Sequence, residues 1–397
     1  MLPTAPRFIA LSLALSLGVA ACRPIEFGIE TPGAVEAVVA TQVAATLEAV
    51  PAATVTPAGP AEAALLPAPV NFLTGGQIWR LERDGSRVTP VTFEAAPVTA
   101  FSVSAADGRL AYVSGNSLYT AAADGQGRAE LITGPRTFGD EQVNRELTNP
   151  QWSPDGRRIA FGLNGVNVID GDGGAARLIL ASDSADAATA QFYRPLAWSP
   201  QGSRLLVEAR YMPHGGRWQV LDLADGSRVD ILPPEGQPCC DPVWSRDGQS
   251  IYFANALGGL IAPGLWRASA DDGAVTTLIN GFAAGTATAV RAPQEFDGGR
   301  LRFFLGNTPD VPDQALPLAM VEAGFTATGL GEPTALGGAA LPVGDILWDP
   351  AGRGAVVVQL EATAAWPPPG RLMWVPSDGG ATVELFQAGA DPQWAAP

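Results

Sequence analysis

The chain has 397 residues and a formal net charge of −16 at pH 7, and because it contains no lysine, all 24 of its basic residues are arginine. These features exclude the basic face on which sequence-independent nucleic-acid binding rests, and they also exclude Schiff-base chemistry and the Gly-Lys phosphate loop. Glycine (46) and proline (35) together make up about a fifth of the chain, which favours a turn-rich all-β protein.

The first residues have the order of a secretory signal. Arg7 precedes an apolar run from Phe8 to Leu17, which is followed by small residues and then by Cys22. The run is too short to span a membrane. The tetrad VAAC resembles the bacterial lipobox, in which the signal is cut before the cysteine and the thiol takes a diacylglyceryl group. An ordinary signal peptide is the alternative. We predict a lipoprotein signal peptide over 1–21, a lipidated Cys22, and an extracytoplasmic protein anchored to the membrane of the cell envelope.

Residues 22–67 have the composition of a tether. The alanine-rich segment 34–50 follows Thr31 and Pro32, which suit a helix start, and it ends at Pro51. A stripe of valines along this segment leaves two interpretations open. The helix could pack against other copies of the chain in an oligomer, or it could be a lone or frayed helix. The proline- and alanine-rich segment that follows predicts a semi-extended spacer.

A repeat with a period near 46 residues dominates the rest of the chain. Tryptophans at positions 152, 198, 244, 348 and 394 are separated by 46, 46, 104 and 46 residues. Four of them lie in the related segments PQWSPDGRRIAFG, PLAWSPQGSRLLVEA, DPVWSRDGQSIYFAN and DILWDPAGRGAVVVQ. Degenerate copies begin at Phe101 and Ala289.

Each repeat reads as four antiparallel strands. The aromatic residue ends a short inner strand, and Ser-Pro-Asp-Gly supplies a tight turn in which proline presets φ and glycine closes the turn. An apolar strand follows, and then a second hairpin with an Asp-Gly or Gly-Gly turn. A unit of this size is typical of a β-propeller blade.

Two markers predict seven blades. The second hairpin recurs near Gln77, Ser117, Asn167, Trp218, Leu265, Leu318 and Leu372. The inner strand recurs near Thr99, Pro150, Leu196, Pro242, Val290, Ile346 and Pro392. The chain starts with three strands and ends with an inner strand, so we expect residues 68–397 to form an all-β, seven-bladed propeller closed by the C-terminal strand.

At WSPDGRRIAF the copies resemble the TolB-type propeller repeat, and they are also similar to the propellers of the dipeptidyl peptidase family. The resemblance covers about residues 68–397. TolB proteins have an N-terminal α/β domain and six blades, whereas this chain shows a tether and seven repeats. The sequence lacks the Gly-x-Ser-x-Gly nucleophile elbow of a hydrolase domain, so the resemblance to the peptidases is confined to the propeller.

Few residues favour catalysis, and no catalytic residue, metal or cofactor is predicted. The single histidine, His214, lies in the loop RYMPHGG, so a histidine-rich metal site is excluded and an exposed loop residue is the better interpretation. The pair Asp170 and Asp172 could suggest calcium, but a solvated hairpin turn fits better.

Cys239 and Cys240 are the remaining thiols once Cys22 is lipidated. In an oxidising compartment they could form a vicinal disulfide, and we predict that they do. Because a bond between neighbours demands a strained backbone, a pair of packed thiols is the alternative.

Loop lengths predict which face of the propeller carries the functional residues. The turns that join the first to the second strand of a blade, and the third to the fourth, are minimal. The other connections are long and individual, and functional residues concentrate on such loops. The aromatic and basic residues expected on this candidate binding face are Phe138, Arg145, Phe192, Tyr193, Arg194, Tyr211, His214 and Trp366.

These features favour a non-catalytic module that binds or assembles an envelope protein or a glycan. A carboxylate-based enzyme acting on glycan with the same propeller is the alternative. Two facing carboxyl groups in a pocket would favour the enzyme, and a shallow face with aromatics would favour binding.

Overall fold

The structure is a computed structural model of the whole chain. Contacts divide the chain into two units, Met1–Glu62 and Ala63–Pro397, and the first unit lies outside the described residues, as do the expected signal peptide, Cys22 and the expected helix 34–50. The residues that the structure describes are 64–135, 145–183, 191–211, 216–232, 241–256, 263–282, 288–307, 316–361 and 369–395.

Four separate sheets have four antiparallel strands each, and in each sheet neighbouring strands are neighbours in sequence. The first contains β4 (Val98–Val103), β5 (Leu110–Ser114), β6 (Ser117–Ala121) and β7 (Ala129–Thr133). The second contains β8 (Thr148–Trp152), β9 (Arg158–Gly162), β10 (Gly165–Asp170) and β11 (Arg177–Ala181). The third contains β12 (Gln191–Trp198), β13 (Arg204–Tyr211), β14 (Gly216–Asp222) and β15 (Arg228–Ile231). The fourth contains β16 (Val243–Trp244), β17 (Ser250–Asn255), β18 (Gly264–Ser269) and β19 (Val275–Asn280).

The other twelve strands form one sheet, and a continuous path through ten of them joins both ends of the fold. Its first part contains β20 (Thr288–Phe296), β21 (Arg300–Asn307), β22 (Pro317–Thr326), β23 (Gly329–Leu330) and β24 (Thr334–Ala335). Its second part contains β25 (Leu341–Trp348), β26 (Gly354–Gln359), β27 (Gly370–Pro376) and β28 (Val383–Trp394). Its third part contains β1 (Val70–Thr74), β2 (Gln77–Leu81) and β3 (Val88–Pro90).

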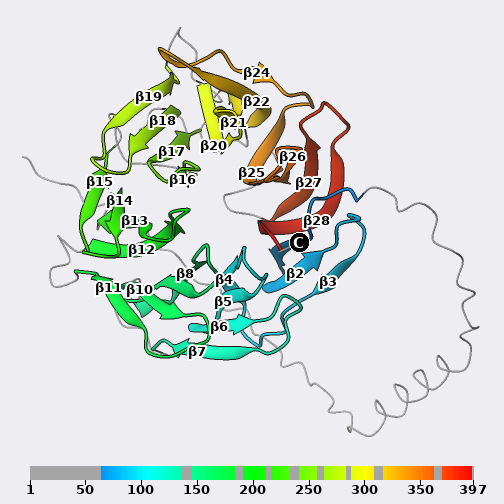
Figure 1. Cartoon of the computed structure of the whole chain (residues 1–397). Helices are drawn as coiled ribbons and strands as arrows, with labels where there is room; N and C mark the ends of the chain where they lie inside the picture. The colour runs from blue at the N-terminus through cyan, green and yellow to red at the C-terminus, as the bar shows by residue number, and fades with distance from the viewer. Residues whose placement is uncertain are drawn as a thin grey trace, which may run out of the picture. The chain divides into compact units, whose positions relative to one another are not determined.

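Strand β28 belongs to two groups of strands at once. Its first half pairs with β27, as in Val383 opposite Trp374, and its second half pairs with β1, as in Trp394 opposite Val70. The C-terminal strand therefore supplies the inner partner that β1 to β3 lack. Figure 1 shows the sheets arranged around a centre, with β4, β8, β12, β20 and β25 on the inside, which is the arrangement of a β-propeller.

The repeated Ser of the first turn has a structural role. Ser153, Ser199 and Ser245 are almost fully buried, and each side-chain oxygen accepts the backbone N–H five residues later, at 2.9, 3.1 and 2.8 Å. The turn glycine that follows has a positive φ, for example 66° at Gly156, where an added Cβ would lie 2.9 Å from both Ala106 and Ser104 of the preceding sheet. The motif therefore closes the turn and also lets two sheets approach closely.

The repeated tryptophan joins successive sheets. Its indole N–H donates to a backbone carbonyl on the inner strand of the preceding sheet. The acceptors of Trp198, Trp244, Trp348 and Trp394 are the carbonyls of Gln151, Ala197, Ala292 and Trp348, at 2.9, 3.4, 2.8 and 2.7 Å. Among the described residues, the indole nitrogen of Trp152 is buried without such a partner.

Arginines make the return contact from the preceding sheet. The Arg158 guanidinium lies 4.8 Å from the ring of Trp198 and donates to the Gly202 carbonyl at 3.0 Å. Arg109 stands in the same way 4.7 Å from Trp152 and donates to the Gly156 carbonyl at 2.7 Å. A planar guanidinium can stack on a ring and donate at its edge at once, which suits arginine and not lysine.

The propeller has two different faces. The turns between the first and second strands, and between the third and fourth, form the short-turn face, which includes Gly156 and Gly202. The connections between the second and third strands, and between successive sheets, form the long-loop face. Within the described residues, no helix is long and apolar enough to cross a membrane.

Both ends of the fold are fixed at the short-turn face. Leu66 is fully buried, and its backbone N–H donates to the Arg83 carbonyl, at the turn between β2 and β3. The Ala395 N–H donates to the Pro69 carbonyl. The expected boundary between tether and propeller at residues 67 and 68 therefore falls beside a residue that already packs in the core.

We predict that Trp198→Phe lowers the free energy of unfolding by about 1–3 kcal/mol, because the Gln151 carbonyl loses its donor while a smaller aromatic ring remains in place. Trp152→Phe is the matched control, since both rings lie under an arginine but the indole nitrogen of Trp152 has no acceptor in the described part of the chain. Urea unfolding of the two variants beside the parent measures the difference. Equal losses in both would show that ring packing, and not the indole hydrogen bond, joins the sheets.

Candidate functional site

Two adjoining pockets open on the long-loop face. The larger, about 760 Å³, lies between the β4–β7 and β8–β11 sheets, and we call it the Glu130 pocket. The smaller, about 350 Å³, lies between the β8–β11 and β12–β15 sheets, and we call it the Phe192 pocket. Glu146 and Thr148 line both pockets, so the two form one continuous depression over three sheets.

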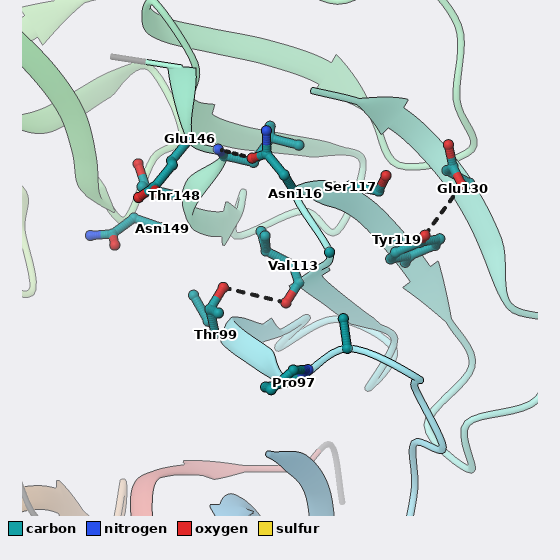
Figure 2. Close-up of a pocket in the computed structure, with 14 residues that line it drawn as sticks. Pro97, Thr99, Val113, Asn116, Ser117, Tyr119, Glu130, Glu146, Thr148 and Asn149 are labelled. Atoms are coloured by element: carbon teal, nitrogen blue, oxygen red, sulfur yellow. Dashed lines mark hydrogen bonds between the residues drawn. The ribbon is translucent and has the colours of Figure 1, made fainter. Parts of the chain in front are cut away.

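The Glu130 pocket takes its lining from the start of β4, the turn between β5 and β6, Tyr119 of β6, Glu130 of β7 and the start of β8 (Figure 2). Figure 2 shows Glu146, Thr148 and Asn149 on one side of the pocket and Tyr119 and Glu130 on the other. The lining residues are Ala96, Pro97, Thr99, Ala100, Val113, Gly115, Asn116, Ser117, Tyr119, Glu130, Glu146, Leu147, Thr148 and Asn149.

Asn116 shapes the pocket by holding the connection that precedes β8. It adopts a left-handed conformation with φ of 58°, which asparagine tolerates better than most residues. Its side-chain amide donates to the carbonyls of Pro135 and Arg145 at 2.9 and 3.2 Å, and its Oδ1 accepts the Leu147 N–H at 2.7 Å. These bonds use the amide fully, so Asn116 positions the wall of the pocket and has little left for a ligand.

The wall on the opposite side is built on two tyrosines. The Tyr119 hydroxyl donates to Glu130 Oε2 at 3.2 Å, and the Thr133 hydroxyl donates to Glu130 Oε1. The ring of Tyr119 stacks on Tyr112 at 5.4 Å between centroids. Glu130 is thus oriented by two neutral hydroxyls.

Arg128 covers this wall from outside. Its guanidinium lies 3.9 Å from the Tyr119 ring centroid and makes two hydrogen bonds to Glu94, at 2.6 and 3.1 Å. These bonds from Arg128 lower the pKa of the Glu94 carboxyl. Burial, helped by the hydrogen bond to Glu94, raises the pKa of Tyr112. Arg128 is therefore committed to Glu94 and does not neutralise Glu130.

The Phe192 pocket contains three of the residues predicted from the sequence. Phe192 is partly exposed in its lining. Arg194 forms an ion pair with Glu208, and Arg210 donates to the other oxygen of the same carboxylate at 3.0 Å. Tyr193 also borders the pocket, but it is only 8% exposed and packs in the core between sheets. Its hydroxyl donates to Gln191 Oε1 at 2.6 Å.

The other predicted residues are placed only in part. Arg145 is exposed, and its carbonyl accepts the Asn116 amide at the edge of the Glu130 pocket. Tyr211 ends β13, and its side chain is outside the description. The residues outside the described ranges are Cys22, Phe138, His214, Cys239, Cys240 and Trp366. Asp172, considered for calcium, instead pairs with Arg109 at 2.8 Å.

Sequence reasoning did not identify Tyr119, Glu130, Thr148 and Asn149, which lie within strands β6, β7 and β8 and not in long loops. The one local signal was the tight Gly115-Asn116 turn, whose asparagine holds the connection to β8. Within the described residues, no three His, Cys, Asp or Glu side chains are grouped to hold a metal ion.

Charged residues also lie on the inner strands, three positions before the repeated aromatic residue. Asp241 forms a two-point ion pair with Arg291 of the next sheet, at 2.5 and 3.1 Å, and accepts the Ala292 N–H at 2.9 Å. Asp345 accepts the Asp391 N–H at 2.9 Å in the same manner. Burial alone would raise the pKa of Asp241, but the Arg291 guanidinium lowers it below its ordinary value.

Asp391 is in a different electrostatic environment. Burial, and next the charge of Asp345, raise the pKa of its carboxyl from 3.8 to about 7, although the Gln393 amide, 3.3 Å from both carboxylate oxygens, opposes the rise. The residue lies on β28, where that strand begins to pair with β1. The closing strand therefore contains a carboxyl group that is half protonated near neutral pH.

The raised pKa predicts that Asp391 makes the fold less stable as the pH rises. The stability associated with protonated Asp391 is fully present below about pH 4 and is lost as the pH rises through about 7. Asp391→Asn should therefore raise the free energy of unfolding at pH 8, by at most about 4 kcal/mol, and flatten its dependence on pH between about 4 and 7. Urea unfolding over a pH series measures this, with Asp124→Asn in an exposed turn as the control. An unchanged pH profile in Asp391→Asn would contradict the assignment.

Comparisons with known proteins agree with the propeller fold. No family model matches the chain. An uncharacterized peptidase, YuxL of Bacillus subtilis (strain 168), is 28% identical over 128 residues, which is 30% of this chain and 16% of that protein. The chain thus matches only a small part of that relative.

Solved structures with a similar fold include a periplasmic gluconolactonase, PpgL of Pseudomonas aeruginosa, which is 17% identical with a TM-score of 0.51, over 83% of this chain and 99% of that chain. TolB of Acinetobacter baumannii is 16% identical with a TM-score of 0.44, over 81% of this chain and 79% of that chain. At these identities the likeness concerns the fold alone. The chain has a β-propeller fold, and TolB proteins are among the propellers that it resembles.

Proposed function

We propose that this chain is a non-catalytic β-propeller lipoprotein that binds a partner of the cell envelope through its long-loop face. The observation that supports this most directly is the continuous depression formed by the Glu130 and Phe192 pockets over three sheets. It is wide and open, and it combines an aromatic residue, arginines and neutral polar groups, which is the composition of a binding surface.

A hydrolytic role for the same depression finds less support. Its carboxylates, Glu130 and Glu146, stand on opposite sides of the pocket in Figure 2, and Glu130 is held by the hydroxyls of Tyr119 and Thr133. A carboxylate-based, glycan-active enzyme is the alternative function, and the similar gluconolactonase shows that a hydrolase can have this fold.

We further propose that the propeller has seven blades. Six groups of strands start at an inner strand, namely β4, β8, β12, β16, β20 and β25, and β28 with β1 to β3 supplies a seventh. The two repeat markers of the sequence lead to the same number. Closure by β28 leaves β1 without a free edge, which is the usual reason for sharing strands between the two ends of a propeller.

The membrane anchor is the third part of the proposal. The order of charged, apolar and small residues before Cys22 supports cleavage and lipidation at that cysteine. Multiple acyl chains give an effectively stable anchor, whereas a single chain gives a marginal one. The structurally similar gluconolactonase is periplasmic, which agrees with an extracytoplasmic location for this chain.

Cys22→Ala should move the protein from the membrane fraction to the soluble fraction, because the acyl acceptor is lost. Cell fractionation followed by immunoblotting measures the distribution. Cys239→Ala serves as the matched control, since it removes a thiol without removing the expected acyl acceptor. Membrane association that persists in Cys22→Ala would contradict lipid anchoring.

The binding role predicts a difference between the two faces. Phe192→Ala and Arg210→Glu should each reduce capture of the partner from native membranes by about tenfold. Arg157→Glu introduces the same charge change at an exposed site beside the first turn of a neighbouring sheet, and should leave capture unchanged. Mass spectrometry of cross-linked material gives the amounts, and thermal unfolding confirms folding. Equal capture by all variants, or equal loss in Arg157→Glu, would reject the long-loop face as the binding surface.

A further inference from the structure

We infer that the Glu130 pocket receives a lysine or arginine side chain presented by a segment of a protein partner. The inference rests on the proposed binding role of the long-loop face and adds to it the chemistry of the partner. It follows from three features: the charge of the pocket, the apolar residues of its lining, and an exposed aromatic residue in one of the connections that line it.

The charge of the pocket is negative. None of its described lining residues is basic, and Glu130 is an exposed carboxylate in its wall. The hydrogen-bond partners of Glu130 are the hydroxyls of Tyr119 and Thr133, which orient the carboxylate without cancelling its charge. A pocket lined in this way repels phosphate and carboxylate groups and attracts cations.

The guanidinium groups of Arg128 and Arg194 do not alter this balance. Arg128 is bound at two points to Glu94, and Arg194 is paired with Glu208 on the far side of the Phe192 pocket. Each of these arginines is thus opposed by a carboxylate of its own. The Glu130 carboxylate therefore offers the pocket a directed acceptor for a cation supplied by a ligand.

The remainder of the lining suits the stem of a long basic side chain. Ala96 and Pro97, which are not buried, supply apolar contact between the two polar sides. Lysine and arginine bury their methylene stems on apolar surface while the charged head reaches a polar group. A small metal ion would gain nothing from these apolar contacts, and a phosphorylated ligand would be repelled.

An exposed aromatic residue in the connection that lines the pocket indicates that the cation belongs to a protein. Phe93 is 82% exposed, and it lies in the same connection, between β3 and β4, as Ala96 and Pro97 of the lining. Exposed aromatic residues next to a pocket are typical of protein interfaces. The volume of about 760 Å³ also exceeds what one side chain needs, and it accommodates flanking residues of a peptide segment.

The test uses fluorescein-labelled hexapeptides and the full chain, with binding followed by fluorescence anisotropy at about 0.15 M salt. The probes are alternating lysine and leucine, alternating glutamate and leucine, and alternating lysine and serine. Labelled maltohexaose is the neutral glycan probe. We expect the lysine-leucine peptide to bind, the lysine-serine peptide to bind more weakly, and the other two probes not to bind.

Paired variants distinguish the pocket from the general negative charge of the chain. Glu130→Gln keeps the size and the hydroxyl contacts, and we expect it to weaken binding of the lysine-leucine peptide by at least about tenfold, or 1.4 kcal/mol. Asp124→Asn removes one exposed carboxylate of the same β4–β7 sheet on the short-turn face, and we expect less than about a twofold change. Phe93→Ser should also weaken binding of the lysine-leucine peptide, but it should leave binding of the lysine-serine peptide unchanged.

The inference is overturned if maltohexaose or the glutamate peptide binds in preference to the lysine-leucine peptide. It is also overturned if Glu130→Gln and Asp124→Asn have equal effects, or if none of the probes binds. Capture of a membrane partner that depends on Phe192 and Arg210, together with any of these results, would leave the binding face in place and reject only the basic side chain.

Discussion

The closed circle of sheets depends on one contact, the hydrogen bond from a tryptophan indole to a backbone carbonyl of the preceding inner strand. It joins sheets at four of the junctions between successive inner strands, from Trp198 onward and through Trp394 of the closing strand. A backbone carbonyl buried between two sheets must find a donor, and the indole is long enough to supply it while its ring fills the space between the sheets. At Trp152 and Trp198, an arginine guanidinium of the preceding sheet also lies over the indole ring and adds a second contact between the two sheets.

The junctions that lack this tryptophan have other polar contacts in its place. At β4 the aligned residue is Val103, and there the Gln393 amide donates to the Phe101 carbonyl at 3.0 Å and accepts the Val103 N–H at 3.1 Å. At β20 the aligned residue is Phe296, and Asp241 binds Arg291 and the Ala292 N–H across the same junction. These contacts bind the degenerate copies to their neighbours, and one of them belongs to the closing strand, beside the unusual carboxyl of Asp391.

The sequence predicted the propeller, its turns and the pairing of its last strand, because those features follow from local patterns of a repeated unit. It could not reveal what each tryptophan bonds to, since the acceptor is a backbone carbonyl 46 to 56 residues earlier and leaves no mark on residue type. Tyr193 was expected at the surface because it follows Phe192 near a long loop. Strand β12 begins at Gln191, however, so the two side chains alternate and Tyr193 turns into the core. Glu130 and Thr148 come together from different sheets, which no local pattern indicates.

The attachment of both ends at the short-turn face determines how far the pockets can extend from an anchor. The chain enters the fold at Leu66, bound to Arg83, and leaves it at Ala395, bound to Pro69, so that an anchoring segment starts from the side opposite the pockets. The segment from Cys22 to Glu62, both included, has 41 residues, and its fully extended contour is at most roughly 140 Å. With an acyl anchor at Cys22, that contour would set the radius within which the long-loop face can search for a partner, and shortening the segment would reduce that reach without altering the pockets themselves.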